Sequence, residues 1–168
     1  MVWEVQNNDV MIKKLKEVVI DHRSRAWCRL PYPGHPKGCP NYGKDETCPP
    51  KAPLLEEIAE PPFVLVAVKF DLEEHVKRMK ERHPNWSDRK ARCLLYWQKK
   101  VDKRLREICE KVASDMPNAL ILYKPEAHGV HVFETCRRAG LTLERNPKKV
   151  VWKVAIIGTK RNSSYQPK

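Results

Sequence analysis

The sequence of 168 residues lacks any hydrophobic run long enough to cross a membrane. Its strongest apolar stretches, Phe63–Val68 and Val150–Ile157, have the length of a buried β-strand. It also lacks a leading apolar segment of signal-peptide length. We therefore expect a cytoplasmic protein without a membrane partner. In such a reducing compartment, metal binding or catalysis explains grouped cysteines better than a disulfide does.

Several common catalytic motifs are also missing. There is no Gly-rich phosphate-binding loop, no paired-histidine helix motif and no Gly-x-Ser-x-Gly elbow. The sequence therefore gives no support to nucleotide-driven, zinc-protease or serine-hydrolase chemistry. The short cysteine pairs of zinc ribbons are absent as well, because the cysteines of this chain are more widely spaced.

What the sequence does contain is a group of three cysteines, Cys28, Cys39 and Cys48, in a stretch rich in proline and glycine. Four prolines and three glycines lie between Cys28 and Cys48. Proline fixes φ and removes a hydrogen-bond donor, whereas glycine leaves φ unrestricted, so no regular helix or strand fits this stretch. Long loops without secondary structure are mostly functional or disordered, and we predict that these thiols bind a metal. The alternative is that they are small buried hydrophobes or a disulfide pair.

Three thiolates allow two kinds of metal site. Cys39 and Cys48 are each followed by proline, as cluster cysteines in ferredoxins often are. A 4Fe-4S cluster held by Cys28, Cys39 and Cys48 would keep one iron open to act as a Lewis acid on a substrate. Alternatively, His35 joins the three cysteines in a closed Cys3His zinc site that stiffens the loop. Cys136 is a further candidate for the fourth ligand.

The segment from Cys39 to Pro50, Cys-Pro-Asn-Tyr-Gly-Lys-Asp-Glu-Thr-Cys-Pro-Pro, resembles the signature of a family of small uncharacterised proteins described only as predicted metal-binding proteins. That family has a Pro-x-x-x-Gly-Val turn before its last helix, and Pro125 to Val130 stands in this place. Some of its members have a second cysteine group, which residues 113–130 lack. The resemblance implies a metal-binding protein with one site.

Groups that could handle protons beside such a site lie in the cysteine loop and at the turn that begins at Pro125. The candidates are Tyr42, Lys44, Asp45, Glu46, Glu126, His128 and His131. The alternative is that the loop residues form a charged surface turn and that His131 only starts a helix.

The formal net charge of +12 is unevenly distributed. Residues 1–72 are neutral, residues 73–111 carry 13 Lys and Arg against 7 Asp and Glu, and residues 137–168 carry 9 against 1. We predict that the C-terminal basic region binds nucleic acid, RNA in particular, or an anionic small molecule. Eight of its nine cations are Arg137, Arg138, Arg145, Lys148, Lys149, Lys153, Lys160 and Arg161. The alternative is a solvated, lysine-rich surface.

Two aromatic residues, Tyr96 and Trp97, lie among the cations Arg92, Lys99 and Lys100. Aromatic rings with basic neighbours can form a platform on which bases stack. More often, such a pair covers the edge of a hydrophobic core.

Hydrophobic periodicity predicts an α/β or α+β domain with a central four-stranded sheet, flanking helices and the cysteine loop at one end of the sheet. The predicted helices cover residues 9–15, 54–58, 71–83, 87–112 and 131–139. Strands are predicted at 18–20, 63–70, 141–143 and 150–158, with a short apolar segment at 119–123. We expect one domain over residues 1–158 and a flexible basic tail over 159–168.

Two functions follow from these patterns. The first is an enzyme that uses an iron-sulfur site on a sulfur-containing or anionic small molecule or on modified RNA. The second is a non-catalytic, zinc-stapled module that binds nucleic acid or protein through its basic face.

Overall fold

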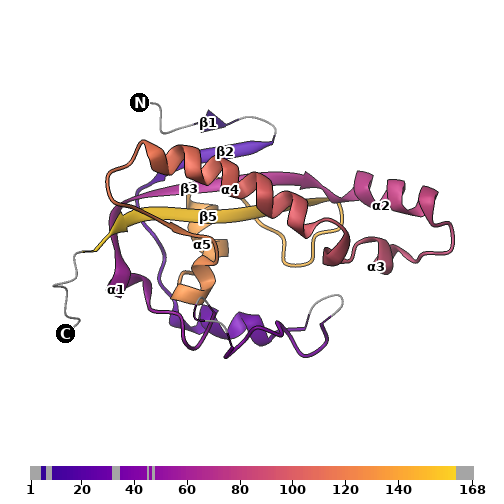
Figure 1. Cartoon of the computed structure of the whole chain (residues 1–168), viewed down its shortest axis with the longest axis horizontal. Helices are drawn as coiled ribbons and strands as arrows, with labels where there is room; N and C mark the ends of the chain where they lie inside the picture. Colours follow the sequence, from indigo (N-terminus) through magenta and orange to yellow (C-terminus); the bar gives the residue numbers. More distant parts are fainter. Residues whose placement is uncertain (1–4, 7–8, 32–34, 45, 47, 162–168) are drawn as a thin grey trace.

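The computed structural model describes residues 5–6, 9–31, 35–44, 46 and 48–161. They form one α+β domain around a single antiparallel sheet with the strand order β1-β2-β3-β5-β4 (Figure 1). The strands are β1 Val5–Gln6, β2 Val10–Leu15, β3 Ala59–Asp71, β4 Ala119–Leu122 and β5 Val150–Lys160. The α-helices are α1 Leu55–Ile58, α2 Leu72–Arg82, α3 Asp88–Ala91, α4 Gln98–Ser114 and α5 Val132–Arg138. Three 3-10 helices are η1 His22–Arg29, η2 Leu94–Tyr96 and η3 Pro125–His128. The α+β alternative of the predicted fold class is confirmed.

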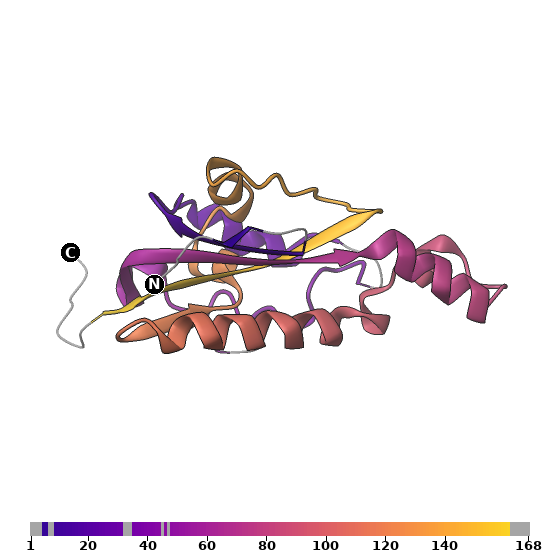
Figure 2. The same ribbon diagram turned by 90° about the horizontal axis from the view of Figure 1, so that it is seen from above.

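Helices cover both faces of the sheet. Figure 2 shows α4 on one face and α5 on the other. Side chains alternate along β3, so that Val66 packs in the cluster on the α4 side and Leu65 in the cluster on the α5 side. Residues 64–68 are at most 1% exposed because both faces are covered. The uniform apolar run of the sequence is therefore the centre of the sheet, as predicted.

The prediction of a helix over residues 9–15 was wrong, because this segment forms β2. Val10 pairs with Val68 and Leu15 with Phe63, so every residue of β2 pairs with a residue of β3. Met11 and Leu15 join the core on the α5 side, and Val10 joins the core on the α4 side. Pairing with a central strand outweighed the local helical spacing of the apolar residues.

The long helix predicted over residues 87–112 is interrupted. Ser87 caps α3 as expected, with its hydroxyl accepting from the Lys90 N–H at 3.2 Å. The chain then turns, and the Trp97 indole N–H donates to the Arg92 carbonyl at 3.0 Å. The Trp97 ring stacks on Phe70 at 4.9 Å and is 5% exposed. Burying this ring stops α3 and starts α4 at Gln98.

Two predicted strands are not formed in the described structure. Ile20 makes one isolated bridge with Val130, and residues 141–143 lie in no strand. Leu141 is nevertheless 8% exposed and belongs to the core on the α5 side. Val18 and Leu141 thus pack in the core without sheet pairing, while β1, β2 and β4 complete the sheet.

The last strand continues to Lys160, two residues beyond the predicted end of the ordered domain. Residues 162–168 of the predicted tail lie outside the described residues.

The cysteine-rich segment lies on the β5 side of the sheet, below it in the view of Figure 1. No helix in the described ranges is both long and apolar enough to span a membrane.

Candidate metal centre

A cleft of about 690 Å³ opens where β4 stops pairing with β5. β4 pairs with β5 only from Ile156 to Thr159, whereas β5 itself starts at Val150. After Leu122 the chain leaves the sheet and leads into η3. The cleft lies in the resulting gap, and its lining includes residues of α4, η3, α5, the first half of β5 and the cysteine segment. All three cysteines of that segment, Cys28, Cys39 and Cys48, line it.

Gly38 brings the first two cysteines together. Its φ is +86°, and a Cβ at this position would lie 2.5 Å from the carbonyl oxygen of Cys28 and 2.5 Å from the carbonyl carbon of Arg29. Glycine permits both the positive φ and this close approach. The N–H of Cys39 then donates to the carbonyl of Cys28 at 2.6 Å. This contact closes the loop between the two cysteines.

The third cysteine is placed by a second set of backbone contacts. The Gly43 N–H donates to the Pro49 carbonyl at 2.7 Å, and the Ala52 N–H donates to the Cys48 carbonyl at 2.9 Å. Cys48 is only 3% exposed. The Lys124 ammonium donates to the Cys48 sulfur at 3.3 Å, so a cation from the segment just before residue 125 contacts this thiol.

Arg25 on η1 ties the Cys48 segment to η3. Its guanidinium donates to the carbonyls of Pro50 and Ala52, both at 2.7 Å, and to the carbonyl of Ala127 at 3.2 Å. A planar fork with several donors suits such a three-way contact. The walls of the cleft that carry Cys28, Cys48 and the η3 residues are therefore one connected unit.

The other two thiols act electrostatically on Cys28. Burial raises the pKa of Cys28 to about 11, and the charges of Glu126, Cys39 and Cys48 raise this pKa further. Such effects require that these groups lie near one another in the same cleft. Without a bound metal the Cys28 thiol is therefore held neutral, whereas a bound metal would stabilise its thiolate form.

Glu126 faces the same cleft from η3. The Ser24 hydroxyl donates to its backbone carbonyl at 3.1 Å. Burial raises the pKa of the Glu126 carboxyl, while Lys153 and Lys124 act in the opposite direction. Lys153 also contacts Asp102 of α4 at 3.5 Å. A carboxyl and two ammonium groups thus accompany the thiols.

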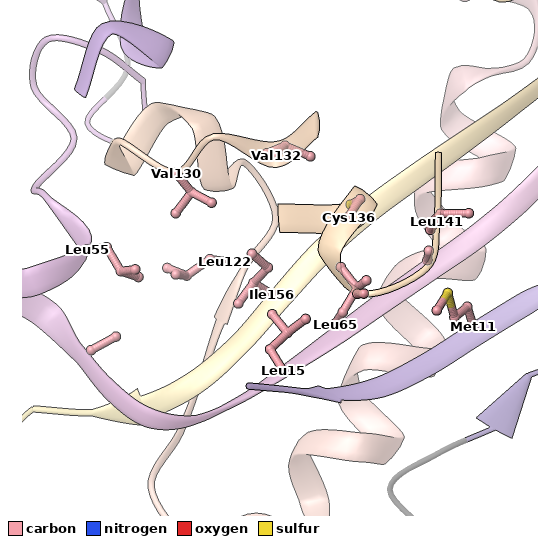
Figure 3. Packing of buried hydrophobic residues seen from close by; sticks show 13 residues of the cluster. Met11, Leu15, Leu55, Leu65, Leu122, Val130, Val132, Cys136, Leu141 and Ile156 are labelled. Atoms are coloured by element: carbon pink, nitrogen blue, oxygen red, sulfur yellow. The ribbon is translucent and has the colours of Figure 1, made fainter. Parts of the chain in front are cut away.

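The two candidates for a fourth ligand are placed differently. His35 lines the cleft together with the three cysteines. Cys136 is fully buried on α5, among the apolar side chains of the core shown in Figure 3, and does not line the cleft. Burial alone raises the pKa of Cys136 to about 12. The structure therefore separates Cys136 from the three thiols and places it in the core.

A zinc ion and a 4Fe-4S cluster need different distances between their thiolate ligands. In the described part of the chain, no three His, Cys, Asp or Glu side chains are arranged to hold a metal ion. The thiolates of one zinc ion would lie about 3.8 Å apart, given Zn–S distances of about 2.3 Å in a tetrahedron. A 4Fe-4S cluster separates its ligands more widely, because each thiolate binds a different iron. Cys28, Cys39 and Cys48 supply three thiols to the lining of one cleft, which is the number of protein ligands in a cluster with one open iron.

Most of the proton-handling candidates lie elsewhere. The His128 ring is buried and its Nδ1 donates to the Pro53 carbonyl at 2.6 Å. His131 caps α5, with Nδ1 accepting from the Glu134 N–H at 3.1 Å. The remaining side chains, Tyr42, Lys44 and Glu46, do not line the cleft, and Asp45 lies outside the described residues. Of the six candidates that the structure describes, Glu126 is the one that lines the cleft.

Sequence reasoning did not identify Lys124 as a site residue, and it named Lys153 only as one cation of the C-terminal basic region. Lys124 directly precedes the Pro125 turn, and Lys153 interrupts the apolar run of β5. A lone lysine within an otherwise apolar strand is the signal that could have indicated Lys153. For Lys124, only the contact with Cys48, 76 positions earlier, shows its place.

The C-terminal cations do not form one unpaired row. Half of the eight contact carboxylates: Arg137 contacts Glu134, Arg138 contacts Glu134 and Glu17, Lys153 contacts Asp102, and Arg161 contacts Glu60. Lys148 and Lys149 are exposed. Much of the positive charge counted in the sequence is therefore balanced locally.

No family model matches the chain, and searches of curated proteins and of solved structures find no match either.

Proposed function

We propose that this protein is an iron-sulfur protein whose 4Fe-4S cluster is held by Cys28, Cys39 and Cys48 in the cleft. The observation that carries this proposal is that three thiols from one proline-rich and glycine-rich segment line a single cleft. Two loop closures support it, the N–H of Cys39 on the carbonyl of Cys28 and that of Gly43 on Pro49. Three thiolates suit a cluster that keeps one iron without a protein ligand, because each thiolate of such a cluster binds a different iron.

We further propose that the cleft is an active site. Bound there, the cluster would supply an iron without a protein ligand, which polarises an oxygen or sulfur of the substrate. The chain's own groups would orient an anionic substrate, because Lys124 and Lys153 are the cations that face Glu126 in the cleft. Glu126, whose pKa is raised by burial, suits a carboxyl that exchanges a proton with the substrate.

The open edge of β5 adds backbone groups to this pocket. The N–H of Lys160 donates to Asn118, so even-numbered residues of β5 face the β4 side. Because the direction alternates along a strand, the N–H and C=O groups of Trp152 and Val154 face the cleft beyond the end of β4. These groups can hold a polar substrate, with specificity coming from fixed donors and acceptors.

The second candidate is a non-catalytic module in which the metal staples the loop. His35 is the observation in its favour, because it lines the same cleft as the three cysteines and could close a Cys3His zinc site. In that case the loop would need rearrangement to bring four ligands to one ion. The basic surface would then bind nucleic acid or another protein.

Replacement of each cysteine by serine tests the assignment of the ligands. We expect Cys28→Ser, Cys39→Ser and Cys48→Ser each to lose most of the bound iron. Cys93→Ser is the matched control, because Cys93 is also partly exposed but does not line the cleft, and it should retain the iron. Iron retained in all three variants, or lost equally in Cys93→Ser, would contradict the assignment.

Thermal melting of the same variants separates the enzyme from the staple. An active-site cluster predicts that Cys28→Ser melts close to the parent while it loses iron. A structural metal predicts that the variant unfolds, since the free energy of metal binding is then part of the free energy of folding.

A further inference from the structure

Helices α2 and α3 extend past one end of the sheet (Figure 2), and we call residues 72–100 the arm. The arm contains α2, α3, η2 and the first residues of α4. Three of its aromatic rings contact one another in a row, called the stack below, in which the first two rings are parallel and the third is tilted by 37°. The rings of His83 and Trp86 are parallel at 4.0 Å with an interplanar angle of 10°, and Trp86 meets Tyr96 at 4.8 Å.

The outer rings of this stack are accessible. His83 is exposed and Tyr96 is 42% exposed, beside Leu95 at 78%. Trp97, the other aromatic residue of this region, is 5% exposed and belongs to the core. Tyr96 rather than Trp97 is therefore the residue that can offer a ring to a ligand.

Positive charge predominates on the arm that carries the stack. The arm has nine Lys and Arg against four Asp and Glu. The Lys90 ammonium lies 4.6 Å from the centre of the Trp86 ring. Other exposed cations of the arm are Lys77, Arg78, Arg82, Arg89, Lys99 and Lys100. Lys80 contacts Asp88 at 2.6 Å and is balanced locally.

We propose that the arm binds single-stranded nucleic acid, with a base stacking on Tyr96 and the backbone phosphates following the surrounding cations. Aromatic rings framed by cations are the recurring device for this ligand, since every base has a flat face and every nucleotide carries a charge. A paired duplex keeps its bases inside the stack and could use only the charges. The excess of cations on the arm favours nucleic acid over a protein partner, because the centre of a protein interface is depleted of charged residues.

The arm adjoins the cleft. The N–H of Glu73 donates to the carbonyl of Lys149 at 3.0 Å, which joins the base of α2 to the segment before β5. Gln98, which follows η2 closely, and Val150 both line the cleft. If the proposed function holds, a strand on the arm could place a nucleotide in the cleft, but binding by the arm itself does not depend on the metal.

Fluorescence anisotropy with labelled oligo(U) and oligo(dT) of about 12 nucleotides tests the proposal at low salt. We expect both strands to bind, a duplex of equal length to bind more weakly, and binding to weaken as salt increases. Tyr96→Leu, which keeps apolar bulk against Trp86, should weaken binding by about tenfold, and Tyr96→Phe should restore it. Leu95→Ala is the matched control from the same turn and should change the dissociation constant by less than about twofold.

Three results would overturn the proposal: no binding to either strand, equal binding by Tyr96→Leu and the parent, or an equal loss in Leu95→Ala. Circular dichroism of Tyr96→Leu verifies that the arm remains folded, and Tyr96→Phe gives the comparison if it does not, because its binding should match the parent. Cys28→Ser should bind the strands as the parent does, so a failure of the arm and a failure of the metal site give different results.

Discussion

Gly38 is the residue whose replacement most directly separates the cysteine site from the rest of the fold. An added Cβ would meet the backbone of Cys28 and Arg29 at 2.5 Å, and this backbone cannot turn away as a flexible side chain could. We expect Gly38→Ala to displace Cys28 from Cys39 and to lower the bound iron severalfold. Iron content and the free energy of unfolding measure the two effects separately.

Gly43→Ala is the control for this substitution. Gly43 also has a positive φ, +76°, but a Cβ there would have only the Pro50 ring at 4.0 Å as a neighbour. The left-handed conformation alone should cost about 1 kcal/mol of unfolding free energy. Equal loss of iron in both variants would show that backbone strain, not the contact with Cys28, controls the site.

At this scale the sequence singled out the three cysteines and Glu126 but not Lys124. The proline and glycine content around Cys28, Cys39 and Cys48 excluded regular structure, which singled them out. Lys124 could not be found in the same way, because its relation to Cys48 depends on where β4 ends. Contacts between distant segments leave no local pattern.

Among the elements, α2 has an N-terminus that the sequence predicted correctly. The Asp71 side chain accepts from the N–H of Glu74 at 3.0 Å. Asp71→Ala should lower the free energy of unfolding by about 1 kcal/mol, because an N-terminal donor of the helix loses its partner. Urea denaturation measures this change.

Glu73→Ala is the matched control in the same turn, since the Glu73 side chain is exposed and caps no N–H of the helix. It should lower the unfolding free energy by less than about 0.5 kcal/mol. A loss in Glu73→Ala as large as that in Asp71→Ala would assign the effect to charge near the helix start instead of to the cap.

Other elements show why local patterns were not sufficient. Met11, Ile12 and Leu15 have a spacing that suits a helix, yet β3 offered a complete partner strand to residues 10–15. The helical pattern after Ser87 was broken by the burial of Trp97 on Phe70. In both cases a contact with β3, distant in sequence, decided the local structure.

At the scale of the whole molecule, the proposed functions occupy adjoining regions. The cleft lies where β5 extends beyond its pairing with β4, and the cysteine segment contributes to its lining. The arm continues from the end of β3 and has nine Lys and Arg against four Asp and Glu. In the C-terminal region, by contrast, ion pairs of Arg138 with Glu17 and of Arg161 with Glu60 balance part of the positive charge. The arm, as the proposed binding site for single-stranded nucleic acid, and the cleft, as the proposed active site, are therefore neighbours.

Metal analysis of the protein purified without oxygen tests the central proposal most directly. Iron, acid-labile sulfide and zinc would be measured per chain together with the visible absorption spectrum. A three-cysteine cluster predicts about four irons and four sulfides per chain and broad absorption near about 400 nm. One zinc per chain without colour, or no bound metal, would contradict an iron-sulfur centre in the cleft.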